Sequence, residues 1–239
     1  MIKRLMAIGL LLVPALAFGS SGGALQDSQI KVNDTASMQR GAALFMNYCS
    51  GCHSLGLQRY SRMAQDLGLT QEQVTQNLVF TDAKFGEPMH AAMTAAEGEK
   101  WFGKAPPDLS LVARNKPGGP DWTYTFLKSF YADSSRPSGW NNTLLVGASM
   151  PHVLWELQGV QHPVLDAAGH VEHLELANPG SQSAAEYDRT VRDITNFLNY
   201  VGEPSAGKRR ALGVWVVLFL VGFSVLAWLL KTEYWRDVH

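Results

Sequence analysis

Cys49-Ser50-Gly51-Cys52-His53 is the stretch of sequence that decides how this chain folds. Two cysteines three positions apart, followed directly by a histidine, are typical of covalent haem c attachment. Each thiol adds to one vinyl group of the haem, and the histidine becomes the proximal ligand of the iron. The sequence contains no other cysteine, so this site uses every thiol. The motif predicts one covalent haem c held by Cys49, Cys52 and His53, with His53 as a metal ligand.

A Cys-x-x-Cys pair also occurs in redox disulfides and as half of many zinc sites. A zinc site needs further cysteines or histidines at ligand spacing, and the sequence has no second such pair. A redox disulfide has no need of His53. The motif therefore favours haem over both alternatives.

Apolar segments near the two ends of the chain indicate export and a membrane anchor. Residues 1–19 combine Lys3 and Arg4 with a short apolar run and an Ala-Leu-Ala cleavage site, which is typical of a secretory signal peptide. The charge-free run Ala211–Leu230 has the length of one transmembrane helix and carries aromatic residues toward its ends. A buried core helix would rarely be apolar on every face. We expect a signal peptide at 1–19, a haem domain at 20–205, a transmembrane anchor at 206–231 and a short tail at 232–239.

Basic residues on both sides of the anchor make its orientation ambiguous. Lys208, Arg209 and Arg210 precede the apolar run, whereas Lys231 and Arg236 follow it. The positive-inside rule weakly places the haem domain in the cytoplasm. Export through a signal peptide and haem attachment both require the haem domain to lie outside the cytoplasm. We expect a single-pass protein of the bacterial inner membrane, with the haem domain in the periplasm and residues 232–239 in the cytoplasm.

The predicted exported domain is acidic although the whole chain is nearly neutral. Residues 20–205 contain 13 Lys and Arg against 19 Asp and Glu, a net charge of −6, whereas the complete chain has −1. An acidic surface argues against nucleic acid as a partner and would attract a basic protein. Ordinary solubility would account for the same charge.

Two helices are expected to form the centre of this domain. The first should run from about Ala36 into the haem motif, where Gly41, Phe45 and Cys49 share one face and the glycine allows another helix to cross closely. The second is expected at 183–202. Its apolar residues recur at spacings of four and three and form one stripe: Tyr187, Val191, Ile194, Leu198 and Val201.

This pair resembles class I cytochromes c, which carry glycine and phenylalanine eight and four positions before the first haem cysteine. Gly41 and Phe45 match those positions, and Ile194 and Phe197 match the residues that pack on the glycine. The long segment after His53 departs from a small cytochrome c. The expected fold is mainly α: a class I cytochrome c-like haem domain with long insertions and a small β-hairpin, plus one C-terminal transmembrane helix.

Further elements are expected from local signals. Thr70 begins a capping box, which predicts a helix over 71–79. Asp108 is expected to cap a short helix that ends at Arg114, and Asp121 to cap the following helix. The aromatic residues of that helix, Trp122, Phe126 and Phe130, are expected to share a face on the haem side. Turn residues between short apolar stretches predict a β-hairpin within 164–176.

The second axial ligand is expected to be a methionine, because Met/His ligation suits electron-transfer haems. Met150 lies in a segment that contains Gly147 and is stopped by Pro151, so its loop can approach the haem. Spacing alone leaves other residues open, namely Met63, Met89, Met93 and His152. Met46 is badly placed, since it lies only three positions before Cys49. In class I cytochromes a proline carbonyl accepts the Nδ1 proton of the proximal histidine, and Pro107 matches that role here; a plain turn is the alternative.

The whole chain resembles the cytochrome c1 family of the cytochrome bc1 complex. The resemblance rests on the haem motif, the segments 59–62 and 105–110, the Gly-x-x-Met-Pro loop and the C-terminal anchor. It implies that Met150 is the distal ligand and that Arg114 contacts a haem propionate. Some bacterial relatives tie down a loop with a cysteine pair that is absent here, so the loop is expected to be held by packing.

The resemblance also implies a function and partners. The chain would be the haem-bearing electron-transfer subunit of a quinol:cytochrome c oxidoreductase, which is not catalytic alone. Its partners would be cytochrome b, a Rieske iron–sulfur protein, and a soluble or tethered cytochrome c. Alternatives are a membrane-anchored cytochrome c of a terminal oxidase or nitric oxide reductase, and a haem-based gas sensor or peroxidase with an open iron site.

Overall fold

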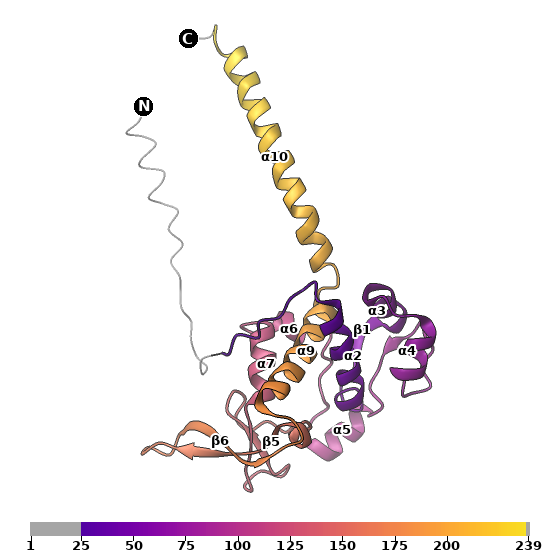
Figure 1. Cartoon of the computed structure of the whole chain (residues 1–239), viewed down its shortest axis with the longest axis vertical. Helices are drawn as coiled ribbons and strands as arrows, with labels where there is room; N and C mark the ends of the chain where they lie inside the picture. Colours follow the sequence, from indigo (N-terminus) through magenta and orange to yellow (C-terminus); the bar gives the residue numbers. More distant parts are fainter. Residues whose placement is uncertain (1–24, 238–239) are drawn as a thin grey trace.

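Two helices that are far apart in the sequence pack against each other at the centre of the domain (Figure 1). The computed structural model describes residues 25–237 and places these helices at α2 (Thr35–Tyr48) and α9 (Ala184–Gly202). The Asp34 carboxylate caps α2, and a capping box begins α9. Both helices lie where the sequence predicts them. The predicted signal peptide, residues 1–19, lies outside the described residues.

Gly41 sets the closeness of this packing. A Cβ atom added to it would lie 2.0 Å from the Asp193 carbonyl oxygen and 2.8 Å from the Phe197 Cβ atom. The rings of Phe45 and Phe197 lie 5.8 Å apart beside it. The predicted stripe of α9 is buried throughout. The expected helix pairing is therefore confirmed.

Six shorter helices complete the helical part of the domain. They are α3 (Tyr60–Leu67), α4 (Gln71–Asn77), α5 (Ala95–Phe102), α6 (Val112–Asn115), α7 (Pro120–Lys128) and α8 (Trp155–Gln158). Helix α4 begins at the predicted Thr70 capping box and ends two residues earlier than expected.

Three antiparallel strand pairs lie around the helices. They are β1 (Leu55–Arg59) with β2 (Pro88–Met89), β3 (Phe130–Ala132) with β4 (Trp140–Asn142), and β5 (Gly159–Leu165) with β6 (Val171–Pro179). The β5–β6 pair is the predicted hairpin, and it is longer than expected because pairing reaches Gly159 and Pro179. It extends away from the helices to one side of the domain (Figure 1).

The predicted cap of the helix that ends near Arg114 is wrong. Helix α6 begins only at Val112, and Asp108 does not cap it. The Asp108 carboxylate instead accepts hydrogen bonds from the Gly56 and Ser110 N–H groups, both at 2.7 Å. Asp108 thus fastens its segment beside the haem motif.

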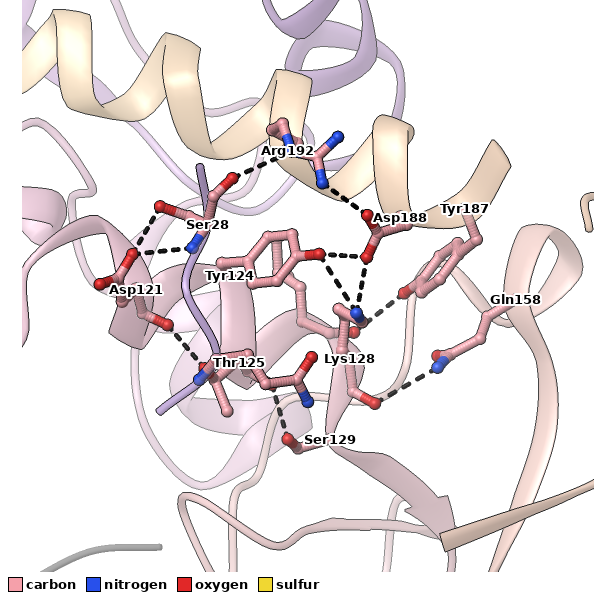
Figure 2. A network of polar contacts seen from close by, with 12 residues as sticks. Ser28, Asp121, Tyr124, Thr125, Lys128, Ser129, Gln158, Tyr187, Asp188 and Arg192 are labelled. Atoms are coloured by element: carbon pink, nitrogen blue, oxygen red, sulfur yellow. Dashed lines mark hydrogen bonds and ion pairs between the residues drawn. The ribbon is translucent and has the colours of Figure 1, made fainter. Parts of the chain in front are cut away.

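The predicted cap of the next helix is also wrong. Helix α7 begins at Pro120, and the Asp121 side chain accepts from the N–H (2.9 Å) and hydroxyl (2.5 Å) of Ser28. Arg192 of α9 donates to the Ser28 carbonyl at 3.0 Å, so the N-terminal arm is bound by both helices (Figure 2). This arm, residues 25–34, carries no helix or strand.

A second set of bonds in the same region joins α7 directly to α9. The Asp188 carboxylate pairs with Lys128 at 2.7 Å and with Arg192 at 2.6 Å, and it accepts from the Tyr124 hydroxyl (Figure 2). Burial raises the pKa of Asp188, but its bonds to Lys128 and Tyr124 and the charge of Arg192 outweigh this and lower the pKa overall. The ionised carboxylate therefore stabilises the position of α7.

The C-terminal helix α10 (Ala206–Tyr234) projects from the domain as a single straight element (Figure 1). Among the described residues it is the one helix that is long and apolar enough to cross a membrane, and none of its apolar window is buried. It begins at the predicted residue and continues three residues beyond the predicted end, to Tyr234.

Candidate functional site

The haem motif lies at the C-terminal end of α2, where the helix turns into a loop. Cys49 is the C-cap residue, and its carbonyl accepts from the Cys52 N–H (3.1 Å) and the His53 N–H (2.9 Å). This turn brings both thiols and the imidazole to the wall of one cavity. Both thiols are free, and burial raises the pKa of Cys49 to about 12, with a smaller contribution from Cys52.

His53 is oriented by a backbone carbonyl. Its Nδ1 atom lies 2.8 Å from the Pro107 carbonyl oxygen, the arrangement expected from class I cytochromes. An Nδ1–H that donates to this oxygen leaves Nε2 as the nitrogen able to bind iron. Burial lowers the pKa of His53, although the bond to Pro107 and the charge of Asp108 act in the opposite direction. The imidazole is therefore held in the neutral form that a metal ligand requires.

The segment that carries Pro107 is itself tied to the haem motif. The Leu109 N–H donates to the Ser54 carbonyl at 2.9 Å. The Met93 N–H, which lies just before α5, donates to the Gly51 carbonyl of the motif at 3.0 Å. Helix α5 packs so closely on this segment that a Cβ atom on Gly98 would lie 2.4 Å from Pro106. The carbonyl that orients His53 is thus fixed from two sides.

Met150 lines the same cavity as His53. Two cavities share six lining residues, which are Cys49, His53, Lys104, Pro107, Ser149 and Met150, and we refer to the two together as the haem slot. The wall of the first half is completed by Tyr48, Cys52, Phe102, Ala105, Pro106, Pro151 and Val153. That of the second is completed by Leu109, Val112, Lys116, Trp122, Thr123, Phe126, Leu127, Leu145, Ala148, Ile194 and Leu198.

The other methionines considered as ligands do not line the slot. Met46, Met63 and Met89 are buried in the core, and Met93 contacts α5 at Gly98.

His152 is also absent from the slot lining, although it lies close to Met150 in sequence. Its ring stacks on Phe130 at 5.1 Å and meets Trp140 edge-on at 5.2 Å. Burial lowers the pKa of His152 to about 4, so the ring is a neutral core residue. The geometry thus supports Met150 over the alternatives that the sequence leaves open.

The residues of the slot fit a haem c. The flat macrocycle is matched by an apolar lining in which Trp122 stacks on Phe126 at 5.0 Å and 9°. Two free thiols stand at one wall, with a neutral imidazole and a thioether available for axial ligation. The expectation that Trp122 and Phe126 form haem-side core agrees with this lining; Phe130 meets Phe126 edge-on but does not line the slot.

Arg114 does not line the slot. It pairs with Glu203 at 3.2 Å, and its side chain is 57% exposed. Its predicted contact with a propionate stays a prediction. Lys104 and Lys116 do line the slot, and the Lys116 ammonium lies 4.4 Å above the Trp122 ring. Sequence reasoning missed both lysines, although each stands close to a segment that it singled out.

Known proteins match this chain over nearly its whole length. The Cytochrome C1 family matches residues 26–100 and 78–238. Cytochrome c1 of Allochromatium vinosum is 49% identical over 244 residues, which covers 99% of each chain. Cytochrome c1 of Rhodospirillum rubrum is 25% identical and covers 86% of this chain and 83% of its own. A protein of Nitrosomonas europaea named ammonia monooxygenase gamma subunit is 44% identical, over 100% of this chain and 99% of its own.

Proposed function

The chain belongs to the cytochrome c1 family and is the electron-transfer subunit of a cytochrome bc1 complex, and we propose that Cys49, Cys52, His53 and Met150 bind its haem c. The proposal is supported most by one arrangement: both thiols, the oriented imidazole and the thioether line a single slot. Three of these residues come from the end of α2, and the fourth comes from a loop about a hundred residues later.

The covalent haem c supplies a one-electron couple, and the residues of the chain hold and tune it. The Pro107 carbonyl fixes the ring of His53 and increases its basicity as a ligand. The apolar wall formed by Trp122, Phe126 and Ile194 excludes water from the slot. Lys104 and Lys116 place positive charge at its lining, where carboxylates of the cofactor would be stabilised.

Electrons are proposed to arrive one at a time from a Rieske iron–sulfur domain and to leave to a soluble or tethered cytochrome c. Within the complex the chain accompanies cytochrome b; one relative of 24% identity is named cytochrome b/c1. The chain binds no quinol itself in this proposal. The net charge of −6 over residues 20–205 supports a basic acceptor.

The chain is anchored in a membrane by one helix, α10. We propose that residues 1–19 are a signal peptide, that 20–205 lie in the periplasm, that 206–231 cross the bacterial inner membrane and that 232–239 end in the cytoplasm. Haem attachment outside the cytoplasm supports this orientation over the nearly balanced charges that flank the helix.

Copurification tests the assignment of partners. A tagged chain should isolate a dihaem cytochrome b and a Rieske protein from membranes solubilised in mild detergent. Isolation of monooxygenase subunits instead would favour the function in the name of the Nitrosomonas relative, and terminal-oxidase subunits would favour a different complex.

Ligation by Met150 is tested in the purified protein. Replacing Met150 with leucine should keep the covalent haem and lower the midpoint potential by about 100 mV or more, because the axial ligand strongly tunes haem potential. The ferrous wild type should be low-spin and unchanged by carbon monoxide, which an open-site sensor or peroxidase would not be. An unchanged potential and a retained sulfur-to-iron absorption band in Met150→Leu would exclude this ligand.

A further inference from the structure

Two adjacent buried asparagines stand at the start of the loop that carries Met150. Asn141 and Asn142 end strand β4 and are 7% and 0% exposed. Buried side-chain amides are costly unless their donors and acceptors are bonded. The bonds that these two amides make all lead to the loop or to elements that border it.

Asn142 joins the start of the loop to helix α7. Its Oδ1 atom accepts from the Leu144 N–H at 2.9 Å and the Leu145 N–H at 3.0 Å. Its Nδ2 atom donates to the carbonyl of Phe126 at 2.9 Å. Phe126 and Leu145 both line the haem slot, so one buried carboxamide connects two parts of its wall.

Gly147 is held by side chains at both of its backbone polar groups. Its N–H donates to Asn141 Oδ1 at 2.8 Å, and its carbonyl accepts from Arg136 Nη2 at 2.9 Å. Asn141 in turn donates to the Asp133 carboxylate at 2.8 Å. The φ angle of Gly147 is 79°, a left-handed conformation that glycine adopts readily. Met150 follows three residues later.

The element to which Asn142 attaches is rigidly placed. Helix α7 is bound to α9 through Lys128, Tyr124 and Asp188 (Figure 2). The loop is therefore joined to helix α7 through Asn142, and to the turn between β3 and β4 through Asn141 and Arg136.

We propose that Asn142, assisted by Asn141 and Arg136, is a positioning residue that holds the Met150 thioether at the haem slot. The proposal rests on Met150 being the distal ligand. A thioether sulfur is a weak hydrogen-bond acceptor and a weak metal ligand, so the geometry imposed by the loop decides whether it keeps its place against a competing base. The sequence predicts that packing replaces the cysteine pair of some relatives; the structure adds these side-chain hydrogen bonds.

Binding of exogenous imidazole to the ferric full-length protein in detergent tests the proposal. Asn142→Leu keeps the branched shape of the side chain and removes its donor and acceptor. Imidazole affinity should rise by about tenfold, equivalent to about 1.4 kcal/mol. The sulfur-to-iron absorption band should weaken, and the midpoint potential should fall. Asn142→Asp keeps the acceptor for both loop N–H groups but loses the donor to the Phe126 carbonyl, so a rise in imidazole affinity smaller than that of Asn142→Leu is expected.

Amide hydrogen exchange measures how readily the hydrogen bonds of the loop open, independently of the haem. Exchange at Leu144, Leu145 and Gly147 should accelerate in Asn142→Leu, and it should accelerate less in Asn142→Asp, which keeps the acceptor for the Leu144 and Leu145 N–H groups. Arg136→Gln provides a second variant in case Asn142→Leu does not fold. It frees only the Gly147 carbonyl, so a smaller rise in imidazole affinity is expected.

Two control variants distinguish a failure of the positioning role from a failure of the ligand assignment. Val191→Ala weakens the buried packing of α9 at a residue that does not line the slot, and an equal rise in imidazole affinity in this variant would overturn the proposal. Met150→Leu sets the upper limit. If it raises imidazole affinity while Asn142→Leu and Arg136→Gln leave affinity unchanged, the positioning role is refuted. If Met150→Leu itself has no effect, the ligand assignment fails, and this proposal fails with it.

Discussion

Replacing Gly41 with alanine should force the two central helices apart. The new Cβ atom would lie 2.0 Å from the Asp193 carbonyl oxygen and 2.7 Å from the adjoining carbon, and contacts under 3.0 Å essentially never occur for real Cβ atoms. The helices must therefore separate by at least about 1 Å at this point, because both contacts are to backbone and no side-chain rotation can relieve them.

The cost follows from the type of clash. Overpacking a core costs about 1–3 kcal/mol and occasionally more, and a clash with backbone belongs at the upper end of that range. Alanine recovers about 1 kcal/mol because it favours the helix over glycine. The net loss in the free energy of unfolding should be about 2 kcal/mol. For a domain of this size, that corresponds to a fall in Tm of about 4–8 °C.

Thermal unfolding of the detergent-solubilised protein, followed by circular dichroism, measures this shift. Gly86→Ala is a matched control, since a Cβ atom there meets nothing within 4 Å, and its Tm should change little. A Tm for Gly41→Ala equal to that of wild type would refute the inferred closeness of the two helices. A fall of the same size in Gly86→Ala would show that the effect does not arise at the crossing.

Three further outcomes are expected. Asp188→Asn should lower the free energy of unfolding by about 1–3 kcal/mol at pH 7, because Lys128 and Arg192 lose a partly buried partner. Since the folded pKa of Asp188 lies below its ordinary value, the difference from wild type, measured by denaturant titration, should shrink as the pH falls below about 4. A chain truncated after Gly207 should be exported, acquire haem and fractionate as soluble; retention in the membrane would place the anchor elsewhere. Stopped-flow reduction of a basic cytochrome c should slow several-fold as the Debye length falls from about 30 Å at 0.01 M salt to about 10 Å at 0.1 M, and a rate that is flat or rising would contradict the docking of a basic partner.

The parts of the fold that could be predicted depend on signals that are local in the sequence. The capping box at Thr70 predicts where α4 begins, and the apolar stripe of α9 recurs at helical spacing. The contact between Pro107 and His53 could be predicted because class I cytochromes have it at the matching positions. The spacing of the two residues alone does not indicate it. The proposal that Met150 is the distal ligand likewise needs a family resemblance, since several methionines satisfy the chemistry of the ligand.

The incorrect predictions concern residues whose partners lie far along the chain. Asp108 and Asp121 have the type and position of helix caps, but they bind Gly56 and Ser28, which lie 52 and 93 positions away. A carboxylate satisfies a distant N–H as well as a nearby one, so composition does not distinguish the two roles. The bonds between Asn141 and the loop were missed for a related reason, because asparagines in irregular segments usually indicate only a turn.

The length of helix α10 and its short connection to α9 together set the distance between the membrane and the haem slot. Its 29 residues are unbroken and span about 43 Å at 1.5 Å per residue. The charge-free portion matches a hydrocarbon core of about 30 Å, which leaves the basic first turn at the headgroups. Only three residues, 203–205, separate this helix from α9, and Arg209 pairs with Glu203 across the junction at 2.7 Å.

The distance from the bilayer to the haem slot is therefore set by residue count. Electron tunnelling falls off exponentially with distance, so the proposed Rieske donor, if tethered to the same membrane, would reach the haem only from a limited range of heights. Four residues inserted after Gly207 would lengthen the helix by about 6 Å. Under the proposed function, this insertion would move the slot away from the Rieske donor and leave the haem site itself intact.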